Sequence, residues 1–253
     1  MAYILEVRRL SKRFGALRAV EDLSFTVRKG TISALIGPNG SGKSTTFNLI
    51  TGHLKPDAGE ILFEGHHLEG LPAEAVARLG IARTFQTPQV FSHLTVLENV
   101  LLAVYQHLRP GRLSALLRTP SFFRKEKGAR EEALYWLERF FLADEAARRA
   151  SELPLGKLRY LELARALALR PKLLLLDEAA SGLDPREKED LARILSQLPR
   201  EGLTLFWVEH DLNLLMELAE EVIVLDQGRK IAQGPPAEIQ KDPRVIQVYL
   251  GEE

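Results

Sequence analysis

The segment at residues 37–44, GPNGSGKS, constrains the fold more than any other part of the chain. It fits the pattern G-x-x-x-x-G-K-[ST] and stands in the context that this pattern requires, after the apolar stretch TISALI and before a helical stretch at 44–50. Glycines in such a turn let consecutive backbone N–H groups point inward, where they form a concave anion site with the helix N-terminus. The motif therefore predicts a strand–loop–helix unit that binds phosphate groups, with a plain glycine-rich turn as the minor alternative.

Two side chains in this loop have specific predicted roles. Lys43 supplies a mobile positive charge for the β- and γ-phosphates of a nucleotide, and the hydroxyl of Ser44 is suited to ligate Mg²⁺. The residues predicted to bind the nucleotide are Gly37, Pro38, Asn39, Gly40, Ser41, Gly42, Lys43, Ser44 and Thr45.

Two adjacent carboxylates, Asp177 and Glu178, follow a run of four leucines at 173–176. That run predicts a buried strand, and in an open α/β sheet ligands bind at the carboxyl ends of the strands. Asp177 is suited to hold Mg²⁺ through water, and Glu178 to orient or deprotonate an attacking water. Acids in this position are often only helix caps, but the accompanying phosphate loop favours the catalytic interpretation.

A third predicted strand, LTLFWV at 203–208, is followed by Glu209 and His210. A lone histidine is more often structural than catalytic, yet this one ends a strand of the same predicted sheet on the same edge. His210 is therefore a candidate catalytic residue. The other histidines lack ligand spacing and the chain contains no cysteine, so a structural zinc site is not expected.

Periodicity divides the chain into three kinds of segment. Alternation at 4–10, 23–27 and 60–63 predicts antiparallel strands, and strand–helix alternation after Pro171 predicts a parallel sheet. Residues 98–170 have a helical period. The expected fold is α/β, with a mainly parallel sheet, an antiparallel β subdomain and an inserted α-helical subdomain. We expect one domain over 1–253, with 1–91 and 171–253 forming the nucleotide-binding core and 92–170 the helical subdomain.

Composition excludes several classes of protein. The 34 basic residues balance the 34 acidic ones, so no overall charge would hold a nucleic acid, and none is expected as a partner. The locally basic stretch 109–130 is interpreted as a solvated helical hairpin rather than a headgroup or acidic-partner contact. No apolar run reaches the length of a membrane span, and the N-terminus lacks the features of a secretory signal. A cytoplasmic location is expected.

With these residues in place, the chain resembles the ATP-binding cassette family over almost its full length. The segments that carry the resemblance are KRFG (12–15), the phosphate loop, RTFQ (83–86), SGLD (181–184) and His210. The resemblance implies a P-loop NTPase core, ATP and Mg²⁺ as ligands, and a second cassette as partner. It also implies that Phe14 stacks on adenine, Gln86 senses Mg²⁺ and the attacking water, Asp184 lies in a loop crossing to the partner, and His210 is the switch histidine.

Within that family the chain looks most like the ATP-binding subunits of branched-chain amino-acid importers. The segments behind this narrower resemblance are FNLITGHLKPDAGEILFEG, GIARTFQ, LTVLENVLLAVYQ, LRYLELARAL and PRVIQVYLGEE. It implies transmembrane permease subunits as partners, an extracytoplasmic solute-binding protein as an indirect one, and a peripheral position on the inner face of the membrane. A groove near residues 86–91, with Val90 and Phe91 as exposed candidates, would receive a permease helix.

Alternatives remain open at this stage. Cassettes for urea or short amides, or for lipopolysaccharide export, belong to the same class, whereas a nucleic-acid or ribosome-linked cassette would often be longer or carry two cassettes. A largely non-hydrolysing regulatory cassette is suggested by the segment LPLGK (153–157), in which Pro154 replaces the signature serine. Gly156 remains to meet the partner's γ-phosphate and Lys157 could add charge there. Ala179 stands where the family usually has proline.

Overall fold

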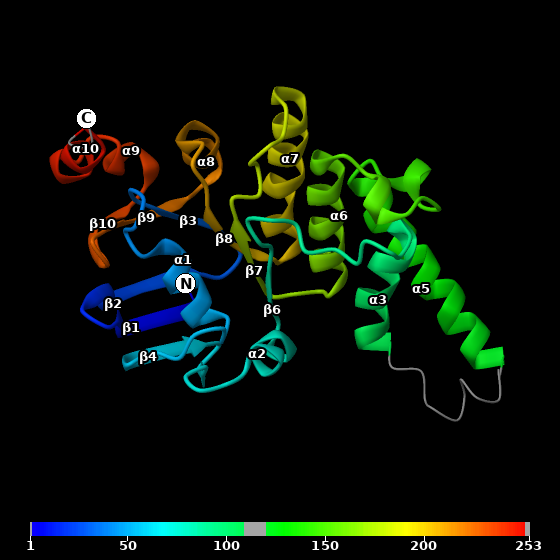
Figure 1. Ribbon diagram of the computed structural model, residues 1–253, viewed down its shortest axis with the longest axis horizontal. Coiled ribbons are helices and arrows are strands. Elements are labelled where there is room, and N and C mark those ends of the chain that lie inside the picture. The colour runs from blue at the N-terminus through cyan, green and yellow to red at the C-terminus, as the bar shows by residue number, and fades with distance from the viewer. Residues whose placement is uncertain (1, 109–119, 251–253) are drawn as a thin grey trace. The chain divides into compact units, whose positions relative to one another are not determined.

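Six strands form the central sheet, in the order β10-β9-β3-β8-β7-β6 (Figure 1). The structure, a computed structural model, describes residues 2–108 and 120–250. Neighbouring strands from β9 to β6 run parallel, and β10 is antiparallel to β9. The strands are β3 (Ile32–Ile36), β6 (Ile81–Arg83), β7 (Leu173–Asp177), β8 (Thr204–Val208), β9 (Glu221–Asp226) and β10 (Arg229–Gly234). Every residue of β3, β7 and β8 is buried, which explains their nearly continuous apolar sequences.

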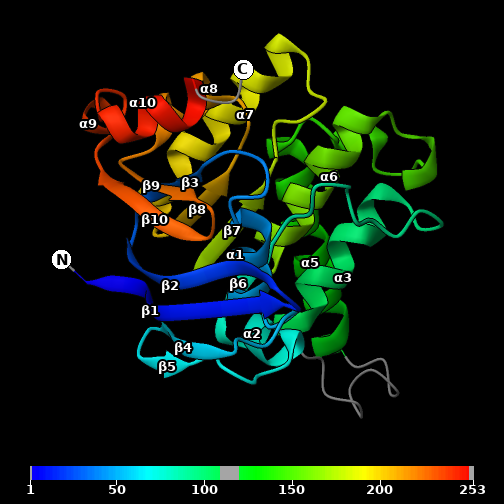
Figure 2. The same ribbon diagram turned by 60° about the vertical axis from the view of Figure 1, so that its left-hand side comes forward.

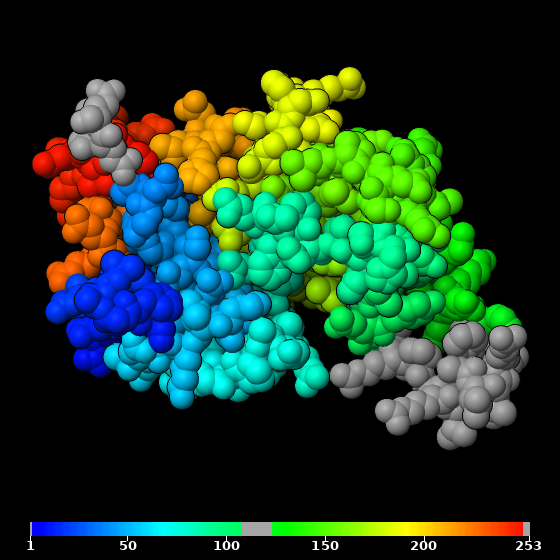
Figure 3. Space-filling view, viewed as in Figure 1, coloured from blue at the N-terminus to red at the C-terminus, as the bar shows by residue number. Residues whose placement is uncertain are grey.

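A second, four-stranded sheet is antiparallel and has the order β2-β1-β4-β5. Its strands are β1 (Tyr3–Phe14), β2 (Leu17–Arg28), β4 (Ala58–Phe63) and β5 (His66–His67), and β1, β2 and β4 lie side by side in Figures 1 and 2. β1 and β2 are longer than the alternation predicts because irregularities interrupt their pairing and shift the period of two. On the face seen in Figure 3 the blue N-terminal segments form one continuous surface.

One hydrophobic core joins the antiparallel sheet to the central sheet. Phe206 of β8 lies between Phe25 of β2, at a ring-centroid distance of 5.5 Å, and Phe47, at 5.2 Å. Phe47 belongs to α1 (Lys43–Ile50), the helix that follows the phosphate loop. Burial of these rings fixes the start of α1 relative to the carboxyl ends of the central strands.

Five further α-helices and one 3₁₀ turn lie before or after the strands of the central sheet along the described chain. They are α2 (Ala73–Leu79), α7 (Pro185–Gln197), the 3₁₀ turn η3 (Leu198–Glu201), α8 (Leu212–Leu218), α9 (Pro236–Ile239) and α10 (Pro243–Leu250). Within the described residues, no helix combines the length and apolar character needed to cross a bilayer.

The chain divides into two compact units. The core unit contains the described residues up to Arg83, 172–181 and those from Glu189 onward, and the helical unit contains 84–171 and 182–188. The helical unit thus extends beyond the helical subdomain expected over 92–170, since the segment around Gln86 and the loop around Asp184 both belong to it.

Among the described residues of the helical unit, three α-helices and two 3₁₀ turns precede the start of α7. They are α3 (Val96–Leu108), α5 (Pro120–Arg139), η1 (Ala143–Glu145), η2 (Ala150–Glu152) and α6 (Leu155–Ala168). Val100, Leu137 and Leu161 from the three α-helices are fully buried. Of the basic stretch 109–130, residues 109–119 lie outside the described residues and the rest belongs to α5. The mainly parallel sheet, antiparallel flank and helical insertion confirm the expected fold class.

Candidate functional site

A cavity of about 360 Å³ in the core unit collects most of the predicted site residues. It lies at the carboxyl end of the central sheet, where the phosphate loop follows β3 and Glu178 follows β7. Its lining consists of Phe14, Leu17, Ala19, residues 39–45, Glu178 and His210. Residues from four separated parts of the sequence thus converge on one cavity, as expected of a ligand site in an open α/β sheet.

The phosphate loop has a backbone that glycine accommodates best. Gly37, Gly40 and Gly42 have φ angles of 151°, 78° and 102°. Gly42 also lies against a neighbouring chain segment, because a Cβ there would come within 2.4 Å of the Ala19 carbonyl oxygen. The Lys43 ammonium donates hydrogen bonds to the carbonyls of Gly37 and Pro38, both at 2.8 Å. These bonds hold the positive charge over the loop, where phosphate oxygens would be bound.

Glu178 and His210 form a pair at this cavity. The Nε2 atom of His210 lies 2.9 Å from Oε1 of Glu178. The Glu178 side chain is 13 % exposed and that of His210 56 % exposed, so the pair faces solvent mainly through the imidazole. Glu178 has a φ of 53°, in the left-handed region that a residue with a side chain rarely adopts. Strained residues of this kind concentrate at functional sites.

Glu209 fixes the backbone on both sides of this pair, a role that the sequence analysis missed. It is 5 % exposed, and its carboxylate accepts hydrogen bonds from the backbone N–H groups of Ala180 and His210, both at 2.9 Å. A buried carboxylate that bridges two loops needs such donors. The signal in the sequence was an acid directly after an apolar strand.

Asp177 is not among the lining residues of the cavity. Its carboxylate is buried and accepts a hydrogen bond from Nη2 of Arg83 at 2.7 Å, in an ion pair whose side chains are each 7 % exposed. Arg83 was not predicted as a site residue, although a charged residue at the end of the apolar strand GIAR was a usable signal.

Gln86 lies in the helical unit, where α6 holds the segment around it. Arg159 donates hydrogen bonds to the carbonyls of Phe85 and Gln86, both at 2.9 Å. Oε1 of Glu162 accepts hydrogen bonds from the N–H groups of Gln89 at 2.9 Å and Phe85 at 3.3 Å. Arg159 and Glu162 are each 2 % exposed, so two buried charges on one helix fix the backbone of this segment.

The same segment carries the candidate permease-facing residues. Val90 is half-buried and Phe91 is 45 % exposed. The Arg165 guanidinium lies over the Phe91 ring, with Cζ 5.2 Å from the centroid. Such a cation–π contact orients the ring without covering it.

Burial raises the pKa of Glu162, although its two backbone hydrogen bonds and the charges of Arg159 and Arg165 oppose that shift. A raised pKa means that Glu162 takes up a proton at a higher pH in the native state than in the unfolded chain. In the unfolded chain glutamate has a pKa of about 4.3. The free energy of unfolding contributed by Glu162 should therefore rise as the pH falls from neutral through the native pKa towards that value.

Glu162→Gln removes this titration. Urea unfolding at a series of pH values should show that wild-type stability, relative to that of the variant, increases on acidification. Comparing the two proteins cancels the opposite effect of surface carboxylates such as Glu64, whose pKa is lowered by hydrogen bonds from Lys172 and Lys29. A stability difference that stays constant with pH, or falls in acid, would rule out a raised native pKa for Glu162.

The signature segment begins α6 in the helical unit. Pro154 occupies the N-cap position and makes no side-chain capping hydrogen bond, whereas serine would offer one. Gly156 is packed so closely that a Cβ would meet the Glu187 carboxylate at 2.6 Å. Lys157 forms an ion pair with Glu145, so its charge is engaged within the helical unit rather than reserved for a phosphate.

Asp184 lies directly before α7 and shares reciprocal hydrogen bonds with Glu187. The Asp184 carboxylate accepts from the Glu187 N–H at 2.8 Å, and the Glu187 carboxylate accepts from the Asp184 N–H at 3.0 Å. This is a capping box, which fixes the loop that contains Asp184. Gln86, Gly156 and Asp184 all belong to the helical unit and Phe14, Lys43, Glu178 and His210 to the core unit.

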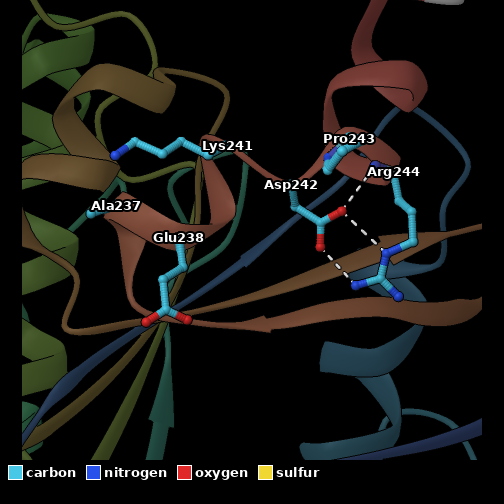
Figure 4. A pocket seen from close by; sticks show the side chains of 6 residues that line it. All are labelled: Ala237, Glu238, Lys241, Asp242, Pro243 and Arg244. Atoms are coloured by element: carbon cyan, nitrogen blue, oxygen red, sulfur yellow. Dashed lines mark hydrogen bonds and ion pairs between the residues drawn. The ribbon is translucent and has the colours of Figure 1, made fainter.

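A larger hollow of about 690 Å³ lies at the junction of α9 and α10. Figure 4 shows its lining, in which Asp242 and Arg244 lie side by side, joined by hydrogen bonds of 2.7–3.1 Å. Their charges satisfy each other, and no predicted site residue lies there. The hollow is therefore a weaker candidate site than the phosphate-loop cavity.

Comparison with known families gives two matches along the chain. The profile described as "ABC transporter" matches residues 20–181. A second profile, "Branched-chain amino acid ATP-binding cassette transporter", matches residues 229–253.

Individual relatives match over nearly the whole chain. The "High-affinity branched-chain amino acid transport ATP-binding protein LivG" of Salmonella typhimurium is 44% identical over 250 residues, covering 98% of each protein. The solved structure of the ADP conformation of MJ1267, "an ATP-binding cassette of an ABC transporter", superposes with a TM-score of 0.84 at 34% identity, covering 100% of both chains.

A second similar solved structure is a dimer. The ATP-binding cassette MJ0796, in a post-hydrolysis state bound to ADP and Pi, has a TM-score of 0.79 at 25% identity and covers 92% of this chain and 98% of its own. The ATPase class expected from the sequence is confirmed by these matches. By its sequence and by its fold, the chain belongs to the ABC transporter family, in which it is a nucleotide-binding ATPase cassette.

Proposed function

We propose that this chain is the ATP-hydrolysing subunit of a transporter that imports branched-chain amino acids. The observation that carries the chemistry is the Glu178–His210 pair, 2.9 Å apart, in the same cavity as the phosphate loop. The proposed solute rests on the likeness to LivG and on the match of residues 229–253 to the branched-chain profile.

ATP would bind through the phosphate loop and the edge of the antiparallel sheet. The backbone N–H groups of the loop and the N-terminus of α1 would cradle the phosphates, and Lys43 would exchange its bonds to the loop carbonyls for phosphate oxygens. Phe14 is 46 % exposed and lines the same cavity, so one face of its ring is available to an adenine base.

Hydrolysis would depend on the Glu178 carboxylate. A water placed for in-line attack on the γ-phosphate would donate a hydrogen bond to Glu178, which polarises it as the bond to phosphorus forms. His210, hydrogen-bonded to the same carboxylate, would fix its orientation. Phosphoryl transfer depends on positioning and charge compensation, so a site held this way needs no covalent intermediate.

Mg²⁺ fits the donors that this site offers. Ser44 lines the cavity, and Asp177 ends β7 with a buried carboxylate. Both side chains offer hard oxygen donors of the kind that Mg²⁺ prefers. Bound with the nucleotide, the ion would neutralise charge on the β- and γ-phosphates. We assign Ser44 and Asp177 to hold it, with Gln86 as the third candidate from the family resemblance.

The complete transporter would contain two cassettes and a permease. Gly156 and Asp184 of one subunit would face the γ-phosphate bound by the other, and Val90 and Phe91 would contact a short permease helix. That partnership would place the chain peripherally on the inner face of the cell membrane. The dimeric MJ0796 cassette supports this arrangement by analogy.

Uptake into membrane vesicles tests the proposed solute. Vesicles carrying this chain with its co-purified permeases and solute-binding protein should accumulate radiolabelled leucine, isoleucine or valine in an ATP-dependent manner. The control is the same vesicles with the Glu178→Gln chain, which should accumulate none. ATP-dependent uptake of urea or acetamide instead of leucine would favour the amide-importer alternative.

A pull-down with solubilised membranes separates the remaining alternatives. Recovery of two transmembrane permeases supports the importer, and recovery of lipopolysaccharide-export components contradicts it. Recovery of rRNA or DNA in place of membrane proteins would point to a nucleic-acid-linked cassette.

A further inference from the structure

The buried guanidinium of Arg83 connects two parts of the core unit that the proposed mechanism uses separately. Arg83 ends β6, and its side chain is 7 % exposed. Through Nη2 it donates a hydrogen bond of 2.7 Å to Oδ2 of Asp177, at the end of β7. Through Nη1 it donates 2.6 Å and 3.3 Å hydrogen bonds to the side-chain oxygens of Asn48 and Thr51, on and just after α1.

We infer that Arg83 is a positioning residue that holds the Asp177 carboxylate in a fixed orientation relative to α1, the helix that begins with Lys43 and Ser44. This inference rests on the proposed role of Asp177 in holding Mg²⁺. Arg83 would thus join the predicted site residues, although it belongs neither to the phosphate loop nor to the acidic pair Asp177 and Glu178. It lies on another strand of the central sheet, β6.

The geometry of the contact supports positioning over simple charge neutralisation. A guanidinium is a planar fork with a fixed spread of donors, so bonds to Asp177 and Asn48 from one fork set the separation of their oxygen atoms. The Phe47 ring restrains the fork further, because Cζ of Arg83 lies 5.7 Å from its centroid. The ring belongs to the same helix as Asn48, so α1 supports the guanidinium by two kinds of contact.

The burial of the Arg83–Asp177 ion pair is a second reason to assign Arg83 a positioning role. A buried ion pair gains little stability over an apolar pair of similar volume, since both charges lose their hydration. The apolar neighbours on β7, Leu173 to Leu176, show that this strand readily accommodates aliphatic side chains. A charged pair at its last residue is therefore better explained by the need for a carboxylate in a fixed orientation than by stability of the fold.

Partners of metal ligands affect metal affinity through the ligand that they orient. Loss of such a partner typically weakens metal binding about 10–100-fold. Arg83→Lys keeps the charge but loses the fork, so the Asp177 carboxylate should retain a counter-charge and lose its fixed orientation. Asn48→Ala removes one anchor of the fork and leaves the ion pair, so it should produce a smaller effect in the same direction.

Binding of Mn²⁺ in place of Mg²⁺ tests this without relying on turnover. Electron paramagnetic resonance should show Mn²⁺ binding to the ATP complex weakened about tenfold or more in Arg83→Lys and by less in Asn48→Ala. Binding of ATP in EDTA should change less than twofold in both. Arg28→Lys is the matched control, because that arginine also approaches a carboxylate, Glu221 at 3.9 Å, away from the phosphate-loop cavity.

Each outcome decides the inference. Native Mn²⁺ affinity in Arg83→Lys, or a matching loss of ATP affinity in EDTA, means that Arg83 only supports the fold. If Arg83→Lys does not fold, native Mn²⁺ affinity in a folded Asn48→Ala would equally contradict the proposal. The Asp177→Asn variant tests the proposed metal site separately. If it leaves Mn²⁺ affinity unchanged, Asp177 holds no metal, and the proposed metal site is wrong independently of Arg83.

Discussion

Glu178→Gln should lower the rate of ATP hydrolysis by roughly 10²–10⁴-fold, the contribution typical of a positioned general base. The amide keeps the size of the carboxylate and can still meet Nε2 of His210, 2.9 Å away in the wild type, but it cannot accept a proton from water. ATP binding should persist, because the phosphate loop and Phe14 are untouched. The variant should accumulate as an ATP-bound dimer in the presence of the permeases.

Phosphate release and light scattering on the same samples measure both effects. Glu64→Gln is the control, since that carboxylate belongs to a surface ion-pair network with Lys29 and Lys172 and should leave hydrolysis unchanged. A variant that hydrolyses ATP at more than a tenth of the wild-type rate would show that Glu178 is not the principal base. If the variant stays monomeric with ATP and permeases present, hydrolysis does not depend on the closure of two cassettes.

Gly42→Ala should weaken nucleotide binding by about 5- to 150-fold. The added Cβ would lie 2.4 Å from the Ala19 carbonyl oxygen, and the φ of 102° disfavours any side chain. Strain of this kind costs about 1–3 kcal/mol, and every 1.4 kcal/mol corresponds to a factor of about ten in affinity. Because Gly42 precedes Lys43 and α1, relief of the clash would move the N–H groups that meet the phosphates.

Gly40→Ala provides a matched control in the same loop. Gly40 also has a positive φ, 78°, but a Cβ there would meet nothing within 4 Å. It should show the backbone strain without the clash, and so a smaller loss of affinity. Calorimetric titration with ADP compares the two, with thermal melting to check that both variants fold. Equal losses would mean that the contact with Ala19 has no part in shaping the loop.

The parallel sheet and the phosphate loop were predictable because both depend on local sequence. Runs such as LLLLD and TISALI fill strands that are buried on both faces, and the loop motif is set by glycine conformation and by charge. The convergence of Glu178 and His210 with the phosphate loop on one cavity also follows from the rule that ligands gather at strand carboxyl ends, whereas Phe14 was expected there only from the family resemblance.

Residues whose role depends on a distant partner were not predictable in the same way. Arg83 and Glu209 act through Asp177 and Ala180, at separations of 94 and 29 residues along the chain. The lengths of β1 and β2 were missed because register shifts break the alternation that would reveal them. The engagement of Lys157 by Glu145 likewise depends on how η1 packs beside α6.

At residue 178 the backbone conformation and the proposed catalytic role favour different residues. Glycine would adopt its φ of 53° with no steric cost, so the fold alone favours a residue without a side chain there. The proposed mechanism, however, needs a carboxylate at this position to accept a proton from water. In the proposed mechanism, a substitution that improves folding at residue 178 therefore comes at the expense of turnover.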